Sequence, residues 1–513
     1  MKKRIISVIL TVSLIVSSIF SLSLFAFAQS KVDGTDIPTV YVGGQGQTIY
    51  DKDGNVIYPI DLSMDEVMAF AENNAETYLN AVLTQDFDEF FDELYNFLYP
   101  VFSTIALDEN GDRTDGSYNE WSWSRDRLNG NKVNGVYPIS RYYFNYDWRL
   151  DPLENAVLLR QYIEDVLYVT GAEKVELIGR CLGANVAESY LYLYDGEYID
   201  SYLQYASASQ GSFMLSKILS GKMGLYPDAI EYFLIDKDFG LGDDVKTIID
   251  SIVTILNKTY GLDLICNIFN YSYEDIYMDI IPRLIGATYG TFPGYWSMVM
   301  DCDYEEAKEV SLYSRGYTED SKLVKRIDDF HYNVMMKKDE LFSRMKEKGI
   351  NICNITKYGY VPYFFLEDVE QLNDDTCFVT ASSEGATTST TTGILPITYL
   401  INAMIKGNDK YISPDLKIDA STCLNPDTTW FIKNLKHPDF PNVVNDLMVN
   451  ILNNNDCTIN SFENYPQYLV YDGEKLNVMN KENKDIDSRY NTTLVGACFS
   501  LVKSIINIIK DSK

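Results

Sequence analysis

The sequence predicts an α/β fold in which a mostly parallel central sheet is interrupted by a large, mainly helical insertion. Three observations lead to this prediction. A short apolar run at 175–178 is followed by a glycine-bounded turn and a helical pattern, as a buried parallel strand would be. A strand pattern at 142–146 and the helix after it lead back to that run, which makes a strand–helix–strand crossover. From about Gln210 to Glu347 this alternation gives way to long helical stretches.

The first 28 residues have the three parts of a secretory signal peptide. Lys2, Lys3 and Arg4 are basic, an apolar stretch follows, and Ala26-Phe27-Ala28 fits the cleavage site. We expect cleavage and secretion. The alternative is an uncleaved anchor that retains the protein at the cell surface, because the uncharged run is long enough to span a bilayer. No later apolar run has that length, so we expect no stable membrane span after cleavage.

The chain is expected to have four parts. Residues 1–28 are the signal peptide, 29–209 the first part of the α/β core, 210–347 a helical cap or lid, and 348–513 the second part of the core. An insertion of this size in an α/β domain usually shapes the substrate pocket, and the alternative is a structural appendage.

The charge and the cysteines exclude several classes of function. The net charge of −31 argues against nucleic acid and against charge-driven binding to anionic membranes, so any lipid contact would have to be hydrophobic. The eight Cys show no C-x-x-C pair and no zinc-ligand spacing. We therefore expect no metal, no cofactor and no dense disulfide framework, and the sequence predicts no specific bridge.

The most informative motif is Gly179-Arg180-Cys181-Leu182-Gly183, between the 175–178 strand and its helix. This is the layout of a nucleophile elbow, in which a tight turn exposes the central side chain at the end of the strand. The two glycines allow strand and helix to approach closely. The central residue is Cys181, whose thiolate would be favoured by the helix N-terminus. The alternative is that Cys181 is a small buried core residue.

A second loop could supply backbone amides to the same site. Residues 37–42 form a strand pattern that ends in Gly43-Gly44-Gln45-Gly46. The amides of Gly44 or Gln45, with that of Leu182, are the candidate oxyanion hole. A plain tight turn is the alternative for this loop. Residues 51–55 predict a hairpin turn, and 64–104 predict acidic helices.

A base and an acid complete the candidate site. In this arrangement the order along the chain is nucleophile, acid, His. Only His331 and His437 are present, and His437 has the right place in that order, after the last predicted strand. We interpret His331 as a surface or lid residue. Asp374 is the preferred acid because it lies in a loop after a core strand. Its alternatives stay open, and each could equally be a solvated loop carboxylate: Asp375, Asp419 and Asp427.

With these residues in view, the chain resembles the lecithin:cholesterol acyltransferase-like branch of the α/β-hydrolases. The resemblance rests on Tyr146-Asp147-Trp148-Arg149, the elbow and the Gly-rich loop at 42–46. Asn373-Asp374-Asp375-Thr376 is similar to the family's Gly-Asp-Gly-Thr acid loop, with both glycines replaced. The resemblance implies an α/β-hydrolase fold and acyl-ester chemistry on lipids, either hydrolysis or transfer to an alcohol. Cys in place of the family's Ser implies a thioester acyl-enzyme or a decayed site.

We therefore expect a secreted lipid acyl hydrolase or O-acyltransferase that acts through Cys181, His437 and Asp374. Its partner is a lipid or another ester, and the sequence does not predict the oligomeric state. The alternative is a catalytically decayed binding protein with the same fold. Residues 284–300 combine bulky apolar side chains with a Pro-Gly turn, which is typical of a flap that opens against lipid or of an aromatic cluster that fastens the insertion to the core.

Overall fold

The computed structural model describes residues 34–60, 62–84, 86–119, 124–236, 243–271, 280–360, 371–391 and 393–480. The signal peptide expected at 1–28 lies outside these residues. In the described ranges, no helix combines the length and the apolar character that crossing a membrane requires.

Eight strands form the central sheet, and the predicted mostly parallel α/β fold is confirmed. Their order is β15-β14-β13-β10-β9-β8-β2-β7, and every neighbouring pair is parallel except β14–β15. The strands are β2 (Thr39–Val42), β7 (Tyr142–Phe144), β8 (Val175–Arg180), β9 (Ile199–Tyr205), β10 (Asn351–Tyr358), β13 (Thr429–Lys433), β14 (Tyr468–Tyr471) and β15 (Leu476–Val478).

The central strands are apolar on both faces because both faces are covered by helices. On one face, Val40 and Leu177 belong to the same buried cluster as residues of α5 (Pro152–Thr170) and α6 (Leu182–Tyr194). On the other face, Tyr41 and Ile178 join a second cluster with residues of α18 (Asn442–Leu452). Neighbouring residues of a strand enter different clusters, as the alternation of side chains along a strand requires.

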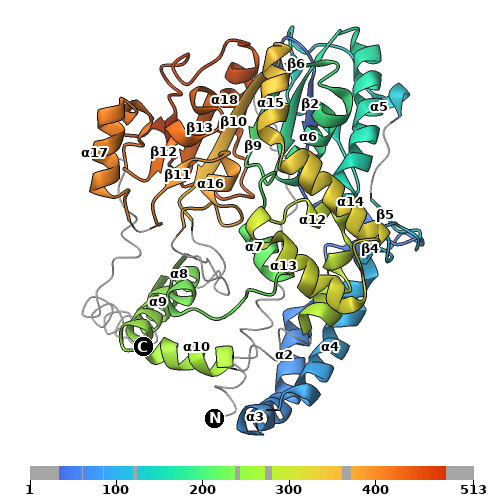
Figure 1. Cartoon of the computed structure of the whole chain (residues 1–513), viewed down its shortest axis with the longest axis vertical. Helices are drawn as coiled ribbons and strands as arrows, with labels where there is room; N and C mark the ends of the chain where they lie inside the picture. Colours follow the sequence, from blue (N-terminus) through green and yellow to red (C-terminus); the bar gives the residue numbers. More distant parts are fainter. Residues whose placement is uncertain are drawn as a thin grey trace, which may run out of the picture.

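Smaller elements surround this sheet (Figure 1). Two small sheets have two strands each: β1 (Gly34–Thr35) pairs with β6 (Tyr137–Pro138), and β11 (Thr387–Thr388) pairs with β12 (Ile418–Asp419). A third sheet has three strands, in which β3 (Ile49–Tyr50) lies between β4 (Val56–Tyr58) and β5 (Tyr118–Asn119). The helices before the crossover are α2 (Met64–Asn73), α3 (Ala75–Thr84) and α4 (Asp88–Phe102). Between β10 and β13 lie α16 (Val379–Ser382) and α17 (Ile397–Lys406).

The described residues between β9 and β10 form no strand. Their helices are α7 (Phe213–Leu219), α8 (Pro227–Asp236), α9 (Asp243–Lys258), α10 (Gly261–Tyr271), α12 (Pro293–Trp296), α13 (Asp301–Ser311), α14 (Lys322–Phe330) and α15 (Lys338–Glu347). In Figure 1, α7 and α13 lie between the sheet and the helices α2 to α4.

Most element predictions are confirmed, with one correction at the end of the sheet. The hairpin turn at 51–55 joins β3 to β4, and Asp151 caps α5, accepting a hydrogen bond from the Leu153 amide. The strand before His437 is not the last one, because β14 and β15 follow it. Their sequences are short and bear Tyr and Asn, so the pattern that marks the buried central strands is weak there.

The segment 284–300 is a buried cluster, which favours the interpretation as an aromatic cluster that fastens the insertion to the core over the interpretation as a flap. Trp296 is 1% exposed, and its Nε1 donates to the Gly290 carbonyl (2.8 Å). A Cβ at Gly294 would lie 2.0 Å from the Trp148 carbonyl oxygen, so the turn packs directly on the core. Asn185 of α6 donates to the Ser297 carbonyl (2.8 Å), which ties the segment to the helix of the elbow.

Trp296→Ala should therefore destabilise the whole protein. Truncating a buried Trp costs about 3–5 kcal/mol, because the cavity left behind does not collapse completely. We expect the free energy of unfolding to fall by this amount in denaturant titrations, and activity on soluble esters and on lipid to fall together. Loss of lipid activity alone, at unchanged stability, would restore the flap.

Candidate active site

Cys181 occupies a strained turn between β8 and α6. Its φ of 50° and ψ of −126° are sparsely populated for a side chain with a Cβ, and such strain is typical of functional turns. The flanking glycines are required by space. A Cβ at Gly183 would lie 2.2 Å from the Val42 carbonyl oxygen, and one at Gly179 would lie 2.7 Å from the Cα of Ala184. The local sequence therefore folds as an elbow that presents the Cys181 thiol at the N-terminus of α6.

The structure brings His437 and Asp374 together. Asp374 follows β10 and His437 follows β13, and the two strands are parallel neighbours. The imidazole Nδ1 lies 2.8 Å from Oδ2 of Asp374, and the His437 amide donates to the Asp374 carbonyl, also at 2.8 Å. The other carboxylate oxygen accepts the amides of Cys377 (2.8 Å) and Thr376 (3.2 Å). The acid is thus fixed by its own loop and orients the imidazole.

Cys181, His437 and Asp374 shift one another's pKa values in the direction that favours their charged forms. Burial alone would raise the pKa of the Cys181 thiol, but His437, with smaller help from Arg180 and the Leu182 amide, brings it below its ordinary value. Burial opposes charge on His437 too, yet Asp374 and then Cys181 hold its pKa well above the usual range. The pKa of Asp374 is lowered despite burial, chiefly by His437. All three shifts favour a thiolate–imidazolium pair over a neutral thiol and imidazole.

The Nε2 atom of His437 is buried without a hydrogen bond of good geometry to a described residue. The charges of both the Cys181 and Cys377 thiols act on this imidazole. Nε2 is thus available to exchange a proton with the nucleophile or with a leaving group.

The Gly-rich loop lies against the nucleophile. A Cβ at Gly44 would lie 2.8 Å from the Cβ and 3.4 Å from the Sγ of Cys181, so only glycine allows this approach. The Tyr146 hydroxyl donates to the Gly43 carbonyl (2.7 Å) and holds the loop in place. The Gln45 side chain donates to the hydroxyls of Tyr58 and Tyr295. The loop that carries Gly44 and Gln45 therefore lies beside the elbow, to which Leu182 itself belongs.

Two buried basic side chains hold the loop that carries His437, and sequence reasoning missed both roles. The Lys357 Nζ donates to the carbonyls of Lys436 (2.7 Å), His437 (2.6 Å) and Asp439 (2.9 Å). Arg180 of the elbow donates to the Pro438 carbonyl (2.7 Å). Burial, with Arg180 nearby, lowers the pKa of Lys357 to about 7. A Lys inside an otherwise buried strand was the one available signal, because such a charge needs partners.

The carboxylates of the rival acids have other hydrogen-bond partners than His437. Asp375, at a φ of 83°, has its carboxyl hydrogen-bonded to Thr376, and burial followed by Asp374 raises its pKa to about 7. Asp419 accepts from Tyr399, and Asp427 accepts from Tyr411.

His331 is buried, so its interpretation as a surface residue is wrong. It does belong to the helical insertion. It is 1% exposed, and its ring stacks on Tyr304 with centroids 3.7 Å apart. Its Nε2 lies 3.1 Å from Oδ1 of Asp301, which also belongs to the insertion. The charged residues around it in the sequence concealed this burial.

One group of residues has the composition of a metal site. Ligand atoms of Asp374, Cys377 and His437 lie within 4.8 Å of one another. The hydrogen bond between the carboxylate and Nδ1 already joins two of the three, which is the geometry of a catalytic acid and base. The same geometry leaves the thiol of Cys377 next to the candidate base.

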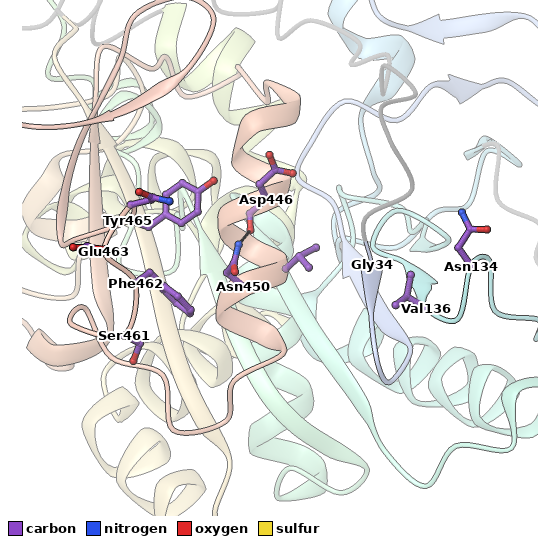
Figure 2. A pocket seen from close by; sticks show the side chains of 11 residues that line it. Gly34, Asn134, Val136, Asp446, Asn450, Ser461, Phe462, Glu463 and Tyr465 are labelled. Atoms are coloured by element: carbon purple, nitrogen blue, oxygen red, sulfur yellow. Dashed lines mark hydrogen bonds between the residues drawn. The ribbon is translucent and has the colours of Figure 1, made fainter.

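A cavity of about 740 Å³ lies away from these residues (Figure 2). Its walls come from α18, from the segment before β14 and from β1 with the loop before β6, and no residue of the Cys181 site lines it: Gly34, Asn134, Val136, Asp446, Val449, Asn450, Ser461, Phe462, Glu463, Asn464 and Tyr465. Gly34 and Tyr465 both precede strands of the parallel sheet. The cavity is therefore at the amino edge, whereas Cys181 is at the carboxyl edge.

Residues 137–362 match the family model for lecithin:cholesterol acyltransferase. This part of the chain is similar to the lecithin:cholesterol acyltransferase family. The matched residues include the crossover, the elbow and the insertion, whereas Gly44, Asp374 and His437 lie outside them. This family supports acyl hydrolase or acyltransferase chemistry on lipids.

The comparisons with solved structures and with curated proteins give no further information about function. A solved structure of a Tle4–Tli4 complex is similar at 12% identity and a TM-score of 0.21, over 64% of this chain and 75% of that chain. So low a TM-score is no basis for an inference. No curated protein matches this chain.

Proposed function

We propose that this protein is a secreted lipid acyl hydrolase or O-acyltransferase that works through a thioester on Cys181. The family supplies the lipid acyl chemistry, and the leader at 1–28 motivates secretion. One observation carries the catalytic part of the proposal. The Cys181 thiol has a lowered pKa beside an imidazole that Asp374 orients, in a turn strained enough to expose it.

The reaction would run in two halves. The Cys181 thiolate attacks the ester carbonyl and forms a C–S bond, and the carbonyl oxygen becomes an oxyanion beside the amides of Leu182 and of Gly44 or Gln45. The tetrahedral intermediate collapses as the C–O bond breaks, and His437 gives its proton to the departing alcohol. Water or an acceptor alcohol then attacks the thioester carbonyl, forms a C–O bond and passes its proton to His437. The C–S bond breaks, the acyl group leaves as a carboxylic acid or as a new ester, and the thiolate–imidazolium pair is restored. Asp374 keeps the imidazole in the required tautomer throughout.

Differential alkylation tests whether Cys181 is an activated nucleophile. Cys302 is the matched control, because it is more exposed than Cys181 and its pKa is raised by burial and by Asp303. Iodoacetamide at pH 6.5 should therefore modify Cys181 about tenfold or more faster than Cys302, since the thiolate is the reacting form. Peptide mass spectrometry over a time course measures both rates.

The same experiment separates the enzyme from a decayed binding protein. Exposure alone predicts that Cys302 reacts first, and that order would contradict an activated Cys181. The alkylation rates of the two thiols should be compared with the rate at which the protein hydrolyses p-nitrophenyl esters of several chain lengths. Fast alkylation without turnover of any ester or phospholipid would favour the binding protein.

A further inference from the structure

The helix α17 turns its apolar side chains away from the protein. Four large aliphatic side chains are about half exposed or more: Ile397 at 69%, Ile401 at 49%, Met404 at 65% and Ile405 at 78%. Their spacing of i, i+4, i+7 and i+8 puts them on one face of the helix. Ordinary surface helices bury such a face against the core.

The opposite face of α17 is the one that is attached. Ala403 is its buried residue, and the Tyr399 hydroxyl donates to Asp419 of β12 (2.8 Å). At 100° per residue, Ala403 and Tyr399 lie about 145° and about 175° around the helix from the centre of the apolar stripe. The helix is thus fixed with its apolar stripe outward. Figure 1 shows it at the periphery of the molecule.

The base of α17 lies at the same edge of the sheet as the candidate site. The Leu395 amide, before the helix, donates to the Leu416 carbonyl after it (2.8 Å). The neighbouring Asp415 accepts from the Tyr358 hydroxyl (3.1 Å) and from Lys433 (3.2 Å), the last residues of β10 and β13. These two strands lead into the loops of Asp374 and His437. The attachment of α17 is therefore on the side of the sheet's carboxyl edge, where Cys181 lies.

The charge around α17 suits a phospholipid surface. The protein has 74 Asp and Glu in 513 residues, yet residues 385–408 contain none. The helix ends in Lys406, and the turn after it contains Asp409 and Lys410, all three of them exposed. The helix itself is free of carboxylates and the charge at its end is +1, so phosphate head groups do not repel it. A net charge of −31 elsewhere disfavours strongly anionic membranes.

We propose that α17 docks the protein on a zwitterionic phospholipid surface, with Ile397, Met404 and Ile405 inserted among the acyl chains. The helix would lie in the plane of the interface, as amphipathic helices do. This inference rests on the proposed lipid acyl chemistry, because docking would bring the carboxyl edge of the sheet to its substrate. The contact is hydrophobic, so it should depend little on salt.

Flotation with phosphatidylcholine vesicles tests the proposal on the full chain. The double variant Ile397→Ser/Ile405→Ser should partition about tenfold or more less than the parent protein, at both 0.05 and 0.5 M NaCl, since two inserted side chains are removed. The matched control is Leu83→Ser/Tyr168→Ser, which removes side chains exposed to 72% and 71% on α3 and α5. It should partition like the parent. Hydrogen exchange should also show vesicle-induced protection in peptides covering 397–408.

The outcomes separate docking from catalysis. Equal flotation of the α17 variant, or no protection at 397–408, would overturn the docking proposal. A variant that instead loses a dimer in sedimentation analysis would assign the apolar stripe to a second copy of the chain, which also overturns it. Hydrolysis of a short soluble ester should be unchanged in both variants. Docking without hydrolysis of any ester would overturn the proposed function alone.

Discussion

Cys181→Ala should abolish turnover of a short p-nitrophenyl ester, with a loss in kcat of about 10⁴-fold or more. Removing the nucleophile of a triad leaves only the catalysis that binding and the oxyanion hole supply. The Ala side chain keeps the Cβ of Cys181, so the strained turn and the fold should be preserved. The measurement is steady-state kinetics on the soluble ester, with the melting temperature as a check on folding.

Two further variants sharpen this result. Cys302→Ala, at an exposed thiol far from the elbow sequence, should retain the parent rate. Cys181→Ser should fall between the two, because a hydroxyl is a weaker nucleophile that depends more on general-base help. If Cys181→Ala turned over the ester at the parent rate, the thioester mechanism would be wrong even though the fold is that of an acyl hydrolase.

The central part of the fold and the elbow could be predicted because their signals are local. Gly179 and Gly183 flank Cys181 within five residues, and their steric role depends only on the strand and helix beside them. The crossover through α5 has a cap, a Pro at its first turn and a regular apolar face. These features specify their own conformation, so one sequence is enough to read them.

The parts that could not be predicted depend on contacts between distant residues. Lys357 and Arg180 hold the carbonyls of the His437 loop, and no local pattern connects a strand Lys to a carbonyl some 80 residues away. His331 is buried because insertion helices enclose it, although the residues around it are charged. The segment 284–300 matched a flap and a buried cluster equally well from its composition. Only its contacts with Trp148 and Asn185 distinguish them.

The outward face of α17 shows a further limit. An apolar stripe in a sequence predicts which residues share a face, but not whether that face meets the core. Here Tyr399 and Ala403 take the core side, and the aliphatic residues remain outside. Sequence reasoning had already required that lipid contact be hydrophobic, and the structure supplies a surface of that kind.

The charge pair at the site predicts a bell-shaped pH dependence of kcat/KM. Activity should rise with pH as Cys181 ionises, and the lowered pKa moves this acid limb below the ordinary thiol range. Activity should fall at higher pH as His437 loses its proton, and the raised pKa moves this alkaline limb above the ordinary imidazole range. The active ion pair exists between the two limbs.

Asp374→Ala should lower kcat by about 10⁴-fold and move the alkaline limb to lower pH. The loss is the size expected when a triad acid is removed, because the imidazole is no longer oriented. The shift has a definite sign. Asp374 is the main group that raises the pKa of His437, so without it the imidazolium deprotonates at lower pH. Stopped-flow or steady-state rates on a soluble ester between pH 5 and 10 measure both effects.

Asp375→Asn provides the control one residue away. Asn tolerates the positive φ of this position, and the change removes a carboxylate that is not among the largest influences on the pKa of His437, where Asp374 leads. We expect its rate to stay within about threefold of the parent, with both limbs of the profile in place. Asp374→Asn should fall between Asp374→Ala and the parent, because its amide oxygen can still accept the Nδ1–H bond. A larger loss in Asp375→Asn than in Asp374→Ala would reverse the assignment of the acid, since it would mean that Asp375 orients His437 in solution.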